Sequence, residues 1–245
     1  MRLKLIACEI LYREVCEVVA RSVNQVDVCF MPKGLHDIGA EKMCNRLAEV
    51  INQVETEPYD AILLGYALCS NGIVGLAARD IPLVVPRAHD CITLFLGSQK
   101  RYEDYFHSHP GVYFHTSGWI ERGNDLDQFG LETVDDPLGA TRSYEELVEK
   151  YGEDNARFLR DEFEAMRRNY RQITFIEMGV EPDGRFERHA QGEAEQKGWE
   201  FEKVAGDLSL LRRLVDGPWD VSDFLVVQPG QKIVPAYDGS LVRAL

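Results

Sequence analysis

Short apolar runs alternate along the chain with segments in which apolar residues recur every three or four positions. The runs are continuously apolar, which is typical of strands buried on both faces of a parallel sheet. The segments between them have the spacing of amphipathic helices. The strands that this pattern predicts span 2–8, 26–32, 59–66, 81–85, 112–116, 172–178, 199–203 and 223–228. The predicted helices span 10–23, 37–55, 72–78, 184–197 and 207–215.

This alternation predicts an α/β fold with a mainly parallel sheet and helices on both faces. We expect the 245 residues to form a single α/β domain. The second half is less regular and predicts a helical and loop-rich elaboration. Residues 117–141 are rich in glycine and acidic residues, and 142–170 are charged and helical with a break near Gly152. A lid or insert is therefore expected around 117–170.

The charge of the chain excludes some classes of partner. A formal net charge of -14 does not fit a nucleic-acid groove, which requires clustered Lys and Arg. Near the start, Glu9, Arg13 and Glu14 interrupt the apolar run before it reaches the length of a membrane span or signal-peptide core. We therefore expect a cytoplasmic protein with no nucleic-acid or membrane partner, whose cysteines are reduced thiols or metal ligands.

Three of the six cysteines fall where a predicted strand has just ended. Cys8 closes the first strand, Cys69 follows the strand 59–66, and Cys91 follows the strand 81–85. Parallel strands bring their carboxyl ends to one edge of a sheet, where open α/β sheets bind ligands. Each thiol is expected at the start of a helix, whose N–H groups lower a thiol pKa and favour the thiolate. We therefore predict that three thiolates meet at this edge.

Three thiolates with an open fourth position suit either a catalytic zinc ion or a [4Fe–4S] cluster whose unique iron binds a substrate. The sequence does not choose between the two. A closed structural zinc site is not expected, because the chain has no C-x-x-C pair. The other three cysteines lie in apolar settings and are assigned to packing: Cys16, Cys29 and Cys44.

Polar residues beside these thiols are further site candidates. His89, which precedes Asp90, and Glu9, which follows Cys8, are candidate fourth ligands or catalytic proton carriers. The alternative for His89 is a loop residue before a helix that Asp90 caps. A Cys91 nucleophile paired with His89 ranks last, because residues two apart at a helix start do not face each other.

Three residues are candidates for binding a small-molecule substrate: Arg87, Asn71 and Arg13. Arg87 would bind an anionic group, or would pair with one of the many acidic residues. Asn71 belongs to the run 70–72, whose residue types permit a tight, anion-binding turn. The chain has neither a P-loop nor a dinucleotide fingerprint, so sites of those types have no support.

Several blocks of sequence carry a resemblance to a known family. The blocks are residues 8–11 with 13–14, 65–72, 86–92 with 96–98, and 118–121. In combination they resemble the signature blocks of the uncharacterised family domain of unknown function 1638, over the whole chain. The resemblance supplies no established activity. It implies that related proteins occur in bacteria and archaea, many of them anaerobes. It also implies a link to corrinoid-dependent methyl transfer, with a corrinoid protein as partner.

Two classes of function follow. The first is a metal-binding protein, in particular a metalloenzyme, in which Cys8, Cys69 and Cys91 hold zinc or an iron–sulfur cluster beside a small substrate. The second is a non-catalytic accessory protein that carries or senses a metal or corrinoid for a partner. Whether the protein turns over a substrate is left open by the sequence.

Overall fold

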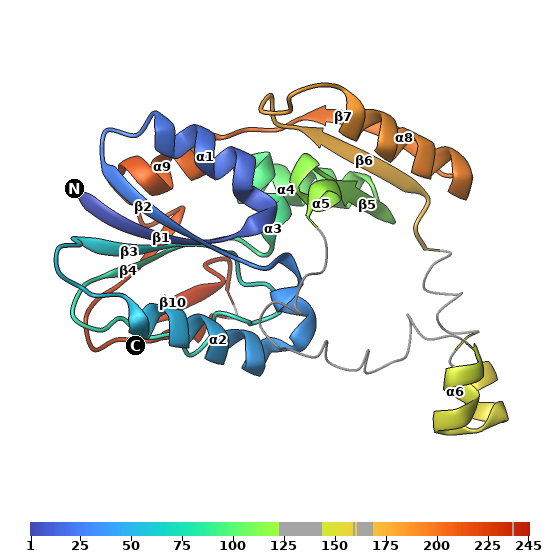
Figure 1. The fold of residues 1–245 in the computed structure, drawn as a ribbon, viewed down its shortest axis with the longest axis horizontal. Helices are drawn as coiled ribbons and strands as arrows, with labels where there is room; N and C mark the ends of the chain where they lie inside the picture. The colour runs from blue at the N-terminus through green and yellow to red at the C-terminus, as the bar shows by residue number, and fades with distance from the viewer. Residues whose placement is uncertain (123–143, 159, 161–168, 237) are drawn as a thin grey trace.

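The computed structural model describes residues 1–122, 144–158, 160, 169–236 and 238–245 (Figure 1). Its central element is a five-stranded sheet with the order β2-β1-β3-β4-β8. The first four strands are mutually parallel, and β8 is antiparallel to β4. The bounds are Arg2–Cys8 for β1, Gln25–Met31 for β2, Ala61–Gly65 for β3, Leu83–Pro86 for β4 and Phe224–Val227 for β8. The predicted α/β class with a mostly parallel sheet is confirmed.

Helices cover both faces of this sheet. The helices α1 (Tyr12–Ala20) and α9 (Ser209–Asp216) pack together on one face, and α2 (Ala40–Gln53) lies on the other (Figure 1). The strands β3 and β4 are therefore buried along their whole length, as their continuous apolar sequence predicts. Short 3-10 helices follow the first two strands, η1 at Glu9–Leu11 and η2 at Lys33–Ile38.

The strands β1 and β3 approach each other closely near the carboxyl edge. Gly65 pairs in register with Ala7. A Cβ atom at Gly65 would lie 2.5 Å from the Cβ of Ala7, closer than real side chains approach. Glycine at this position therefore lets the chain leave β3 directly beside the end of β1, where the polypeptide continues to Cys8.

The remaining predicted strands form a second sheet. The strands β5 (Val112–His115), β6 (Gln172–Glu177) and β7 (Glu200–Ala205) make a parallel sheet in the order β5-β6-β7. The helix α8 (Arg185–Lys197) packs on β6 and β7. The apolar pattern predicts these strands but not their separation from the central sheet, because strand partners are chosen by contacts distant in sequence.

The predicted helix at 72–78 is wrong. Residues 69–75 form turns, and Ala77 makes an antiparallel bridge to Lys232. The N–H of Ile233 donates to the carbonyl of Leu76 at 2.8 Å, which holds this segment against the hairpin of β9 (Ile233–Pro235) and β10 (Val242–Ala244). Extended pairing with the end of the chain therefore overrides local helical spacing.

The region around 117–170 is described in part. Residues 117–121, expected within a loop, form the short helix α5 (Ser117–Glu121). The break near Gly152 is confirmed, because this residue has a φ of 79° between α6 (Tyr144–Tyr151) and a helical turn at 153–158. The rest of the expected lid, 123–141, lies outside the described residues. In the described part of the chain, no helix is long and apolar enough to cross a membrane.

Candidate functional site

The structure brings Cys8, Cys69 and Cys91 together at the carboxyl edge of the central sheet. Cys8 is the last residue of β1, Cys69 follows β3, and Cys91 is the first residue of α3 (Cys91–Leu96), which follows β4. The thiols are close enough to influence one another: Cys69 contributes to a raised pKa of Cys8, and both contribute to a raised pKa of Cys91.

Burial keeps these thiols protonated. Loss of solvent raises the pKa of Cys8 to about 12 and that of Cys69 to about 11, and it raises the pKa of Cys91 well above its usual value. The expectation that helix-start N–H groups favour thiolates is therefore wrong for the thiols by themselves. Desolvation is the larger effect, and Cys69 begins a turn rather than a helix.

The turn that carries Cys69 is strained. Cys69, Ser70 and Asn71 have φ values of 44°, 55° and 70°, so three successive residues other than glycine adopt left-handed conformations. The N–H of Cys69 donates to the carbonyl of His89 at 3.0 Å, which fixes this turn against the segment that leads to Cys91. Strain of this kind concentrates at functional sites, because the surrounding structure must maintain it.

A buried tyrosine lies behind the thiols. Tyr66 is 4% exposed, and its hydroxyl lies within hydrogen-bonding reach of the Cys8 thiol. Burial raises its pKa, and neighbouring Cys8 and Cys69 raise it further. Tyr66 was not among the predicted site residues. Its place three residues before Cys69 was the available signal, because a hydroxyl in an apolar run needs a partner.

A cavity of about 570 Å³ opens beside two of the thiols. One part of its lining comes from the turn after β3 and the segment that enters α3, and the other part comes from α4 (Gln99–Ser108), β5, α5 and Tyr170. The lining residues are Leu68, Cys69, Ser70, Asn71, His89, Asp90, Cys91, Ile92, Phe95, Tyr102, Val112, Tyr113, Phe114, Thr116, Trp119 and Tyr170. The cavity has the size of a small-molecule site.

Of the predicted polar residues, Asn71 and His89 reach this cavity. Asp90, between His89 and Cys91, is the N-cap of α3, and its Oδ1 accepts from the N–H of Ile92 at 3.0 Å. The ring of His89 lies 6.3 Å from that of Tyr102. His89 thus lines the cavity and directly precedes the residue that caps α3, and its role as a ligand or proton carrier stays a prediction.

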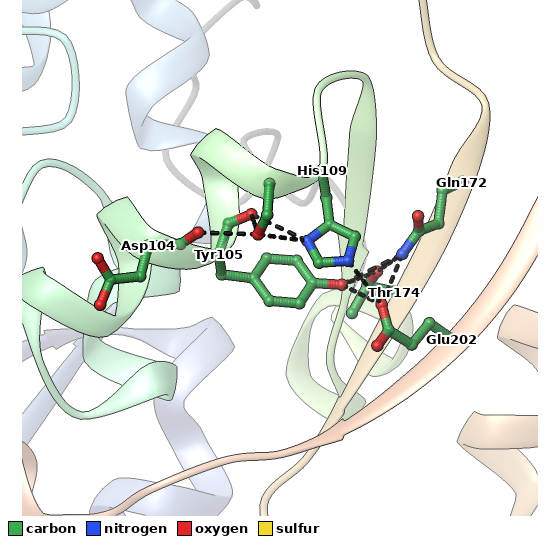
Figure 2. Close-up of polar contacts among 7 residues, drawn as sticks. Asp104, Tyr105, His109, Gln172, Thr174 and Glu202 are labelled. Carbon is green, nitrogen blue, oxygen red and sulfur yellow. Dashed lines mark hydrogen bonds and ion pairs between the residues drawn. The ribbon is translucent and has the colours of Figure 1, made fainter.

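A polar cluster joins the helix α4 to the second sheet (Figure 2). The hydroxyl of Tyr105 donates to Oε2 of Glu202 at 2.5 Å and lies 2.8 Å from Oγ1 of Thr174. Gln172 donates to the same Glu202 oxygen at 2.8 Å, and His109 stacks on the Tyr105 ring at 4.1 Å. The cluster thereby fixes α4, which presents Tyr102 to the cavity one turn earlier.

Three predicted site residues make contacts elsewhere. Oε1 of Glu9 accepts from the N–H of Lys33 at 2.9 Å. Arg13 forms an ion pair of 2.7 Å with Glu121. None of the three predicted residues, Glu9, Arg13 and Arg87, lines the cavity in the part of the chain that the structure describes.

Arg87, which directly follows β4, makes hydrogen bonds to backbone carbonyls near the end of the chain. Its guanidinium donates to the carbonyls of Val221 at 2.9 Å and Ser240 at 2.7 Å, and also to that of Val242. The side chain is therefore occupied by backbone carbonyls. Its role in substrate binding stays a prediction without a contact that supports it.

The other cysteines lie apart from the site. Cys44 donates from Sγ to the carbonyl of Val74 at 3.1 Å, and both Cys29 and Cys44 pack against the core. Cys16, expected to pack, is exposed on α1. The buried positions of α1 are Glu14, Val15 and Val18, so the helical period turns Cys16 outward.

The three thiols do not form a ready coordination set. Within the described ranges, no group of three or more His, Cys, Asp or Glu side chains is arranged so that it could hold a metal ion. Binding a cation at Cys8, Cys69 and Cys91 would therefore require the side chains to rotate and lose their protons.

The fold and the site together define an α/β protein with a thiol-lined cavity at the carboxyl edge of a mostly parallel sheet. Residues 30–215 match the model of a family described as protein of unknown function (DUF1638), so the chain belongs to this family. This confirms the resemblance to the family over residues 30–215, whereas the block at residues 8–14 lies outside the matched range. No curated protein and no solved structure matches the chain.

Proposed function

We propose that the protein binds a metal centre through Cys8, Cys69 and Cys91, and that the adjoining cavity admits a small molecule to it. The observation that carries the proposal is the convergence of three thiols from three strand ends: Cys8 is buried, and Cys69 and Cys91 are partly buried and line the cavity. A buried cysteine by itself is a small hydrophobe. Three that meet at the ligand-binding edge of a parallel sheet favour a shared ligand.

Two further features support a ligand at this place. The left-handed backbone at Cys69, Ser70 and Asn71 costs free energy that a purely structural turn would avoid by using glycine. The Tyr66 hydroxyl lies beside the Cys8 sulfur and would donate a stronger hydrogen bond to it if that sulfur became a thiolate. A soft cation supplies the charge that stabilises buried thiolates.

The centre is zinc or a [4Fe–4S] cluster, because three thiolates leave one coordination position open in both. Zinc would activate a bound thiol or water, and a cluster would act as a Lewis acid or an electron donor. His89 is the cavity residue suited to the open position or to proton transfer. The cavity beside the thiols favours a metalloenzyme over a protein that only stores metal.

A second candidate is an accessory protein that carries or senses a metal or corrinoid without turnover. The link to corrinoid-dependent methyl transfer, with a corrinoid protein as partner, belongs to this proposal and rests on the family resemblance. Turnover of a small substrate by the purified protein would exclude the accessory role.

The test is elemental analysis and visible absorption of protein purified without oxygen. Stoichiometric zinc without colour, or iron with sulfide and a brown colour, supports the proposal and identifies the centre. Replacement of Cys8, Cys69 or Cys91 by Ser should lower the metal content, whereas replacement of the exposed Cys16 should not. An equal loss of metal in the Cys16 variant and in the Cys8, Cys69 and Cys91 variants overturns the proposal. Reduced protein that takes up neither zinc nor iron also overturns it.

A further inference from the structure

We propose that the cavity selects a ring-containing, positively charged small molecule and rejects anions. This deepens the proposed function by naming the class of ligand, and it rests on that function for the ligand's place beside the thiols. It replaces the expectation of an anionic substrate, which was based on Arg87 and on the turn 70–72; Ser70 and Asn71 of that turn line the cavity but carry no positive charge. The guanidinium of Arg87 is bound instead to the carbonyls of Val221, Ser240 and Val242.

The charge of the lining favours a cation. Among the described residues that line the cavity, none is Lys or Arg, and Asp90 is the one carboxylate. Oδ1 of Asp90 accepts from Ile92 and Oδ2 from Tyr102, so each oxygen keeps a lone pair for another donor. Three thiolates on a divalent cation carry a net charge of about -1, which would make the cavity more negative still.

Two lysines that contact aromatic rings of the cavity wall are engaged by protein acceptors. Lys33 lies over the Trp119 ring and donates to the carbonyls of Trp119 at 3.2 Å and Arg122 at 2.6 Å. Lys197 lies 5.8 Å from the centre of the Tyr113 ring and pairs with Glu193 at 2.6 Å. These contacts direct both ammonium groups to protein acceptors rather than to a ligand.

The apolar part of the lining is largely aromatic. The rings come from α3, α4, β5, α5 and the segment before β6, and they are Phe95, Tyr102, Tyr113, Phe114, Trp119 and Tyr170. Aromatic faces stack on flat rings and attract cations, and they repel anions. A volume of about 570 Å³ accommodates a ligand of two fused rings with a short charged arm.

The experiment compares three probes of nearly equal shape: 1-naphthylmethylamine, 1-naphthylmethanol and 1-naphthoate. Binding is measured by isothermal titration calorimetry on the full chain near pH 7, with the metal content of each sample determined. The expected order of affinity is amine, then alcohol, with the carboxylate weakest. A carboxylate that binds as tightly as the amine, or absence of binding by all three, overturns the proposal.

Two variants test whether the amine probe binds in this cavity. Asp90→Asn removes the charge but keeps a favoured N-cap residue, so we expect it to weaken amine binding about tenfold and alcohol binding by no more than about threefold. Tyr170→Ala removes a half-exposed ring and should weaken amine and alcohol alike, by roughly three- to tenfold. Amine binding that is unaffected by both changes would place the probe outside this cavity and overturn the proposal.

The same measurements separate the two proposals. Amine selectivity in protein that takes up no metal would refute the metal centre and retain the cationic ligand. Metal held by the three thiols, with anion selectivity in the cavity, would refute the ligand class alone.

Discussion

The hydroxyl of Tyr102 donates a hydrogen bond of 2.9 Å to Oδ2 of Asp90, the residue that caps the helix beginning at Cys91. This bond joins α4 to the start of α3 between two residues that line the cavity. The carboxylate raises the pKa of Tyr102, after the larger effect of burial, so the phenol stays a donor. The Asp90 side chain thereby fixes both the start of the helix that carries Cys91 and the position of the Tyr102 ring in the cavity wall.

Replacement of Asp90 should separate its capping role from its charge. Asp90→Ala removes the acceptor for the Ile92 N–H and the partner of Tyr102, so we expect a loss of about 1–2 kcal/mol in the free energy of unfolding. Asp90→Asn keeps one acceptor, the amide oxygen, for the Ile92 N–H, and its amide nitrogen can donate to the Tyr102 hydroxyl, so this variant should lose less. Urea unfolding of the two variants checks the order, and equal losses would contradict it.

Metal uptake should release protons and become tighter as the pH rises. The pKa values of about 12 for Cys8 and about 11 for Cys69 lie far above neutrality, so each thiol must lose a proton to become a ligand. The apparent affinity should therefore rise by up to about tenfold per pH unit for each proton released. Zinc titration calorimetry in buffers of different ionisation enthalpy measures the protons directly. Uptake without proton release would show that the thiols are not the ligands.

Glu14 should make the protein less stable as the pH rises from about 4.5 to about 8. This residue of α1 has 0% exposure, and its carboxyl oxygens have no hydrogen-bond partner in the part of the chain that the structure describes. Burial raises its pKa from 4.5 to about 8, with a smaller contribution from Glu181. The folded state therefore favours the protonated acid, and this contribution is complete below the unfolded pKa and is lost as the pH rises toward 8.

Replacement of Glu14 by Gln tests this dependence. The neutral amide should raise the free energy of unfolding near pH 8 and change it little near pH 4.5, with a difference that grows by up to about 1.4 kcal/mol per pH unit between these values. Glu41→Gln on the exposed surface of α2 is the matched control, and we expect little change at either pH. Parallel stability curves for wild type and Glu14→Gln would contradict the prediction.

Gly118 should be indispensable for the packing of α5. A Cβ atom there would lie 1.7 Å from the carbonyl oxygen of Ile10, which belongs to backbone and cannot rotate away. Gly118→Ala should cost about 1–3 kcal/mol and displace Trp119 from the cavity wall. Gly192→Ala in α8 meets no atom within 4 Å and should stabilise the protein by about 0.5–1 kcal/mol. Thermal unfolding checks the opposite signs.

The local sequence predicts most of the strands and the meeting of the three cysteines. Continuous apolar runs define β1, β3 and β4, and the junctions after them place Cys8, Cys69 and Cys91 at one edge. The helix expected at 72–78 fails because its backbone pairs instead with β9, more than 150 residues later in the chain. Such pairing leaves no trace in a window of neighbouring residues.

The sequence by itself determined the α/β class and the alternation of strands with helices, because these depend on local periodicity. It also determined the family, because specific blocks of residues carry that resemblance. Only the tertiary structure decided that the strands divide into two sheets and that aromatic residues from the second sheet complete the cavity. It alone showed that Arg13 and Arg87 are bound elsewhere and that burial holds the thiols protonated. Solvent exclusion and contacts between distant segments set these features, and neither is encoded in the spacing of residues along the chain.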